Sequence, residues 1–103
     1  MNRAFLLAVT LAVSAPDVMA QEVSEGVKRA CRSTADQTAR TIAYAKRAKL
    51  DPASQVRKVA DSWLEGVQTH MLLSASRADH LSEGELAALG YSYCVERRPT
   101  NVR

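Results

Sequence analysis

The two cysteines constrain this chain more than any other feature. Cys31 and Cys94 lie 63 positions apart, so they form no Cys-x-x-Cys redox motif, and two thiols alone make no zinc site. In an oxidising compartment such a pair forms one intramolecular disulfide. Closing a loop of that length stabilises a fold by about 4 kcal/mol in the chain-entropy model. The sequence therefore predicts a small domain closed by a structural Cys31–Cys94 bond.

Residues 1–20 predict export into such a compartment. Arg3 supplies a positive charge, residues 4–15 carry no charge, and Val18-Met19-Ala20 has the small-residue pattern after which signal peptidase cuts. The apolar run is shorter than the about 20 residues that span a membrane. We expect a signal peptide over residues 1–20, and a periplasmic or secreted single domain over residues 21–103, with no membrane span in the mature protein.

Helix-capping signals divide the mature chain into three expected helices. Asp51-Pro52 combines an N-cap with proline at the first helical position, and Ser82 with Glu85 forms a capping box. No stretch alternates apolar and polar residues at the period of a strand. We expect helices at about residues 24–49, 52–76 and 83–98, with a frayed tail over 99–103. The predicted fold class is all-α: a small three-helix up-down-up bundle with one disulfide, after removal of the signal peptide.

The up-down-up topology also predicts that the cysteines meet. At 1.5 Å per residue, Cys31 stands about 12 Å along the first helix and Cys94 about 16 Å along the third. In that topology these two helices run the same way from the same end, which places the cysteines at similar heights. Gly66 and Gly90 lie at similar depths on the second and third helices. We therefore expect those helices to cross closely near the two glycines.

The sequence contains no motif for catalysis, metal binding or nucleotide binding. We expect no enzyme activity, no catalytic residue, no cofactor and no metal site. His70 lies on the apolar arc of the expected second helix. The favoured interpretation of His70 is a histidine at the edge of the core that is hydrogen-bonded to a neighbour. A pH sensor is the alternative, because an imidazole gains a proton in mildly acidic solution.

The exposed arc of the first helix has the strongest charge asymmetry. Six cations share that arc with Asp36 as its single acid: Lys28, Arg29, Arg32, Arg40, Lys46 and Arg47. The arc is either a solvated face that keeps the protein soluble or a docking surface for an acidic protein or an anionic envelope polymer. We expect no nucleic-acid partner, because the net charge is only +3 and the chain is exported.

The layout resembles that of the small acid-stress chaperones of the bacterial periplasm, which are short, all-helical and held by one disulfide. The resemblance is one of architecture, rests on Cys31 and Cys94, and carries over no functional residue. We expect a small exported binding or adaptor protein that docks an acidic partner through the basic face of its first helix. The alternatives are an acid-stress chaperone that loosens at low pH, which the resemblance implies, and a small inhibitor or immunity-type protein.

Overall fold

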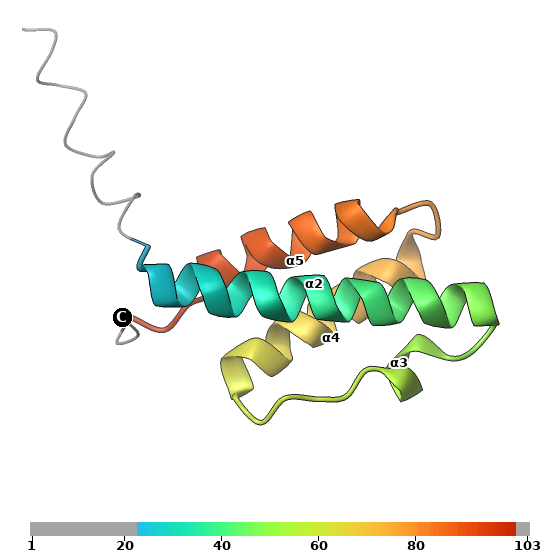
Figure 1. Ribbon diagram of the computed structural model, residues 1–103, viewed down its shortest axis with the longest axis horizontal. Coiled ribbons are helices and arrows are strands. Elements are labelled where there is room, and N and C mark those ends of the chain that lie inside the picture. Colours follow the sequence, from blue (N-terminus) through green and yellow to red (C-terminus); the bar gives the residue numbers. More distant parts are fainter. Residues whose placement is uncertain (1–22, 101–103) are drawn as a thin grey trace, which may run out of the picture.

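The computed structural model describes residues 23–100, and within them all regular structure is helical (Figure 1). The elements are α2 (Glu25–Ala48), α3 (Pro52–Gln55), α4 (Ser62–Arg77) and α5 (Glu83–Glu96). The predicted all-α class is confirmed. The expected signal peptide and the end of the expected tail lie outside the described residues. None of the helices within 23–100 combines the length and the apolar character that a membrane crossing requires.

Side-chain caps begin each of these helices. The N-cap oxygens that accept hydrogen bonds from the first turns belong to Ser24, Asp51, Asp61 and Ser82. At α5 the expected capping box is complete, because Ser82 N donates to Glu85 Oε1 at 2.8 Å and Glu85 N donates to Ser82 Oγ at 3.1 Å. The hydrogen bond from the Ser82 backbone lowers the pKa of the Glu85 carboxyl. The capping prediction from the sequence is therefore confirmed at residues 51 and 82.

The single helix expected over residues 52–76 is wrong for residues 56–61. α3 ends after one turn, the chain continues in extended form, and Asp61 caps a new helix. The side chain of Gln68 replaces helical hydrogen bonds there: its Oε1 accepts from Val59 N at 3.1 Å, and its Nε2 donates to Arg57 O at 3.0 Å. Valines favour extended backbone and Asp61 offers a second cap, so the break has a local cause as well.

The up-down-up topology is also wrong, because the extended segment makes the return path and α4 then runs the same way as α2 (Figure 1). Near the ends of those two helices, Lys46 Nζ donates to Ala75 O at 3.2 Å. α5 runs against both. At the start of α4, Trp63 Nε1 donates to Cys94 O, near the end of α5, at 3.0 Å.

The Cys31–Cys94 disulfide is confirmed, although the expected geometric reason for it is wrong. The two Cα atoms lie 5.6 Å apart, and both side chains are completely buried. Cys31 lies near the start of α2 and Cys94 near the end of α5. Because α2 and α5 are antiparallel, these two helix ends meet. The bond therefore joins the beginning and the end of the described fold at one end of the bundle.

The core fills the space between α2, α4 and α5. Its completely or almost completely buried apolar residues include Val27, Cys31, Ala35, Ala39, Ile42, Val67, Met71, Leu86 and Cys94. The expected close crossing is right for Gly90, where an added Cβ would overlap the side chain of Met71. It is wrong for Gly66, where an added Cβ would meet open space. Only one of the two glycines is therefore needed for helix packing.

Candidate functional site

Three of the six cations on the predicted basic face are engaged in contacts within the fold. Lys46 bonds to the Ala75 carbonyl and lies 3.7 Å from Asp79, so it joins α2 to the end of α4. Lys28 lies 3.5 Å from Glu25. The Arg32 guanidinium lies over the Tyr91 ring, 5.2 Å from its centroid. A periodic pattern places these cations on one arc but cannot reveal partners on other helices.

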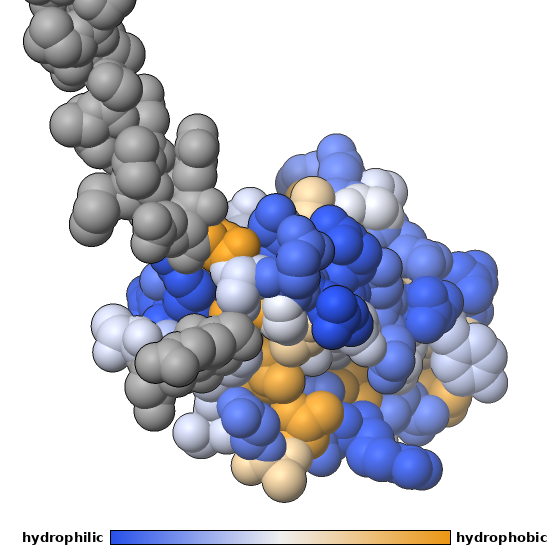
Figure 2. Space-filling view, turned by 60° about the vertical axis from the view of Figure 1, so that its left-hand side comes forward, coloured by the Kyte–Doolittle hydropathy of each residue, from blue (hydrophilic) through white to orange (hydrophobic). Residues whose placement is uncertain are grey.

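The other three cations form what we call the arginine ridge, defined as Arg29, Arg40 and Arg47. All three are exposed, and none forms an ion pair with another residue of the described part of the chain. They project within a narrow arc of α2, since residues separated by eleven or seven positions return to nearly the same angle. The surface seen in Figure 2 is largely hydrophilic, with hydrophobic residues in smaller bands between.

His70 stacks on Tyr93 of α5. The ring centroids lie 3.9 Å apart and the planes differ by 5°, and the Arg97 guanidinium lies 4.7 Å from the centroid of the same tyrosine ring. His70 is half-buried. Among the described residues it has no carboxylate within ion-pair distance. This arrangement is that of a core-edge histidine held by stacking, and its use as a pH sensor stays a prediction.

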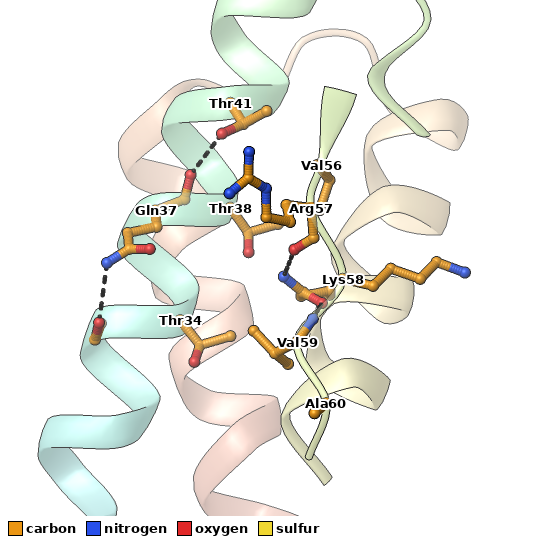
Figure 3. Close-up of a pocket in the computed structure, with 11 residues that line it drawn as sticks. Thr34, Gln37, Thr38, Thr41, Val56, Arg57, Lys58, Val59 and Ala60 are labelled. Atoms are coloured by element: carbon orange, nitrogen blue, oxygen red, sulfur yellow. Dashed lines mark hydrogen bonds between the residues drawn. The ribbon is translucent and has the colours of Figure 1, made fainter. Parts of the chain in front are cut away.

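A groove of about 480 Å³ separates α2 from the extended segment (Figure 3). Its walls are formed by Ser33, Thr34, Gln37, Thr38, Thr41, Val56, Arg57, Lys58, Val59, Ala60 and Gln68. We refer to it as the threonine groove. The prediction from the sequence missed it, because a continuous helix over 52–76 leaves no extended wall. The hydroxyl stripe at Thr34, Thr38 and Thr41 was the available signal.

The threonine groove combines two buried threonines with a positive charge. Thr34 and Thr38 are 9% and 3% exposed, and neither hydroxyl has a hydrogen-bond partner among the described residues, whereas Thr41 Oγ1 donates to Gln37 O at 3.1 Å. Figure 3 shows the Arg57 side chain directed across the groove toward α2, with Lys58 directed away. Lys58 lies 3.8 Å from Glu65 instead. No acidic residue lines the groove.

Within residues 23–100, no three potential metal-ligating side chains come together. The fold is that of a small all-helical domain closed by one disulfide. Comparisons with protein-family models, curated proteins and solved structures find no match to this chain.

Proposed function

We propose that the mature chain is a small exported binding protein without catalytic activity, which docks an acidic partner protein through the arginine ridge. Removal of residues 1–20 would release it as a periplasmic or secreted domain. The observation that carries the proposal is the ridge itself: three exposed guanidinium groups, each without an ion-pair partner in the described chain, on one side of a helix that the disulfide anchors to α5.

Electrostatics favours this ridge as a contact surface. Arginine presents planar, paired donors to carboxylates, and a cationic surface speeds the approach of an acidic partner. A ridge on a helix held in place by packing loses little freedom on binding, which lowers the entropic cost of association. Lys28, Arg32 and Lys46 already have partners within the fold, so they are the weaker half of the predicted face.

The test is charge reversal of the ridge with a control of equal charge change. The variant Arg29→Glu/Arg40→Glu/Arg47→Glu should keep the fold, because exposed charges contribute little to stability. It should lose the partner captured from a periplasmic extract. The control Lys49→Glu/Arg77→Glu/Arg97→Glu changes three exposed residues outside the ridge and the threonine groove, and it should retain that partner. Capture by the wild type should weaken as salt rises, because salt screens exposed charges.

The same experiment separates the kinds of partner. Captured material that survives protease treatment would be an anionic envelope polymer rather than a protein. A captured enzyme or toxin whose activity falls on binding would identify the inhibitor or immunity-type alternative. A ridge variant that captures its partner as well as the wild type would overturn the proposal.

The stack at His70 favours one second candidate, the acid-stress chaperone. Protonation of His70 would add a cation to a tyrosine ring that already carries Arg97, between α4 and α5. Repulsion between this cation and Arg97 at the same ring would favour separation of the two helices and exposure of core residues. Trp63 reports this directly, because its Nε1 bonds to Cys94 O across the same interface. In mild acid, the Trp63 fluorescence should shift to longer wavelength in the wild type and not in His70→Phe. The same shift in both proteins, or no shift in either, would exclude the chaperone function.

A further inference from the structure

We propose that the threonine groove seats an extended acidic peptide segment of the partner protein. This inference rests on the proposed function only for the acidity of the partner, and it names a different set of residues as the recognition site. Thr34 and Thr38 would donate hydrogen bonds to backbone carbonyls of the segment. Arg57 would bind one of its carboxylates.

The burial of the two threonines is the first support. A buried hydroxyl without a partner is unfavourable, and such groups in folded proteins are almost always satisfied by protein, water or ligand. Thr38 is 3% exposed and Thr34 is 9% exposed, and both line the groove without a hydrogen bond to the described chain. Two hydroxyls left this way in one groove indicate a site that a ligand with acceptor oxygens can complete.

The spacing of these hydroxyls matches an extended peptide. Thr34 and Thr38 are one helical repeat apart, which separates them by about 6 Å along α2. In an extended chain, carbonyls on the same side recur every second residue, at about 6.6 Å. Both hydroxyls can therefore reach successive same-side carbonyls of one segment.

The size of the groove fits a short segment. Along α2 it extends from Ser33 to Thr41, a rise of about 12 Å. Four extended residues at about 3.3 Å each cover that length. The volume of about 480 Å³ also falls within the range of about 300–1,000 Å³ that is usual for ligand sites.

Charge selects an acidic segment. The groove is lined by no Asp or Glu, and its Arg57 forms no ion pair within the described chain. Lys58 does not add to this charge, because it is directed away from the groove and pairs with Glu65 (Figure 3). Arg40 of the ridge is adjacent in sequence to Thr41 at the groove wall. Because side chains of an extended peptide alternate between two sides, acidic ones can face Arg57 while others face the ridge.

The test uses a blocked, fluorescently labelled peptide of sequence Glu-Ser-Glu-Ser, with Gln-Ser-Gln-Ser as its neutral counterpart. Anisotropy should show binding of the acidic peptide and markedly weaker binding of the neutral one.

The variant Thr34→Val/Thr38→Val keeps the shape of both side chains and removes the hydroxyls. Its affinity for the acidic peptide should fall about tenfold, which corresponds to the loss of one or two hydrogen bonds. Thr34→Ser/Thr38→Ser keeps the hydroxyls and should bind as the wild type does. Arg57→Gln should lose the preference for the acidic peptide.

Amide chemical shifts of the wild-type protein provide a readout that depends on no variant. The peptide should shift the amides of residues 34–41 and 56–60. Shifts confined to other regions would overturn the proposal. Complete displacement of the peptide by free glutamate at equal carboxylate concentration would also overturn it, since the site would then recognise single anions.

The groove and the ridge can fail separately. If the ridge variant loses the captured partner while the valine variant binds peptide and partner normally, the threonine hydroxyls do not recognise the segment, and the proposed function stands without the groove. If the valine variant loses the peptide while the ridge variant keeps the captured partner, the groove is a site and the ridge is a solvated surface. Normal binding by both variants would overturn both proposals.

Discussion

The two flanks of α2 differ in what packs against them. On the flank toward α5, Cys31, Ala35 and Ala39 recur at helical spacing and are completely buried. On the flank toward residues 56–60, Thr34 and Thr38 recur at the same spacing and line an open groove. Both flanks consist of small side chains. One of them is closed and apolar, and the other is open and polar.

The difference follows from the backbone of the neighbouring element. A helix such as α5 satisfies its own amides and carbonyls, so small apolar side chains can pack directly against it. An extended segment has no internal hydrogen bonds and needs polar neighbours. Gln68 supplies two of them, to Arg57 and Val59. The polar side of α2 is thus the side that faces a segment whose backbone lacks helical hydrogen bonds.

The largest expected effect on stability comes from a change on the closed flank. Removing the disulfide in Cys31→Ser/Cys94→Ser should lower the free energy of unfolding by about 4 kcal/mol, since the bond closes a long loop. Chemical denaturation of the variant, and of the wild type with and without reductant, measures it. A loss below about 1 kcal/mol would show that packing of α2 against α5 suffices without the bond.

A smaller effect on the free energy of unfolding is expected where α4 meets α5. Gly90→Leu should destabilise by about 1–3 kcal/mol through overpacking, because even a Cβ there overlaps Met71. Gly66→Ala is the matched control, since its Cβ enters open space and alanine is the better helix former. It should stabilise by up to about 1 kcal/mol. Thermal unfolding of both variants checks the contrast. Equal effects at the two positions would contradict it.

On the open flank, loss of the Gln68 amide should cost less and act locally. Gln68→Met keeps the volume but leaves Val59 N and Arg57 O without their partners, which should cost about 1–2 kcal/mol. Hydrogen exchange at the Val59 amide should accelerate by more than global unfolding explains. The exposed Gln55→Met serves as control. Unchanged exchange at Val59 would show that the segment is held in place by Val56 packing instead.

The features that the sequence predicted correctly are local. The caps at Asp51 and Ser82 depend on residues within three positions, and the helix class depends on composition and period. The cysteine pairing was also predictable, because two cysteines in a domain that is expected to be exported leave one intramolecular choice. The parallel arrangement expected for the first and last helices was wrong, because α2 and α5 are antiparallel (Figure 1).

The features that were missed depend on contacts distant in sequence. The break at 56–61 is stabilised by Gln68, nine positions beyond Val59. The direction of α4 and the threonine groove both follow from that break. In the same way, the helical period placed Lys46 on the basic face, but its hydrogen bond to Ala75 spans 29 positions. Periodicity within one helix contains no information about such partners.

The smallest expected effect lies at the start of α5, at the opposite end of that helix from the disulfide. The Ser82 backbone amide lowers the pKa of Glu85, with a further lowering from the Ser82 side chain. A carboxyl whose pKa is lower in the folded state contributes stability above its unfolded pKa, and this contribution is lost as pH falls through the folded value. Glu85→Gln keeps an acceptor for Ser82 N but cannot ionise, so its stability should depend less on pH in that acidic window. Glu83→Gln is the control, because Glu83 lies in the same first turn but outside the capping box. Urea midpoints across the acidic range should converge for wild type and Glu85→Gln at the lowest pH. If the urea midpoints of wild type and Glu85→Gln differed by the same amount at every pH, the Glu85 charge would contribute nothing to the cap.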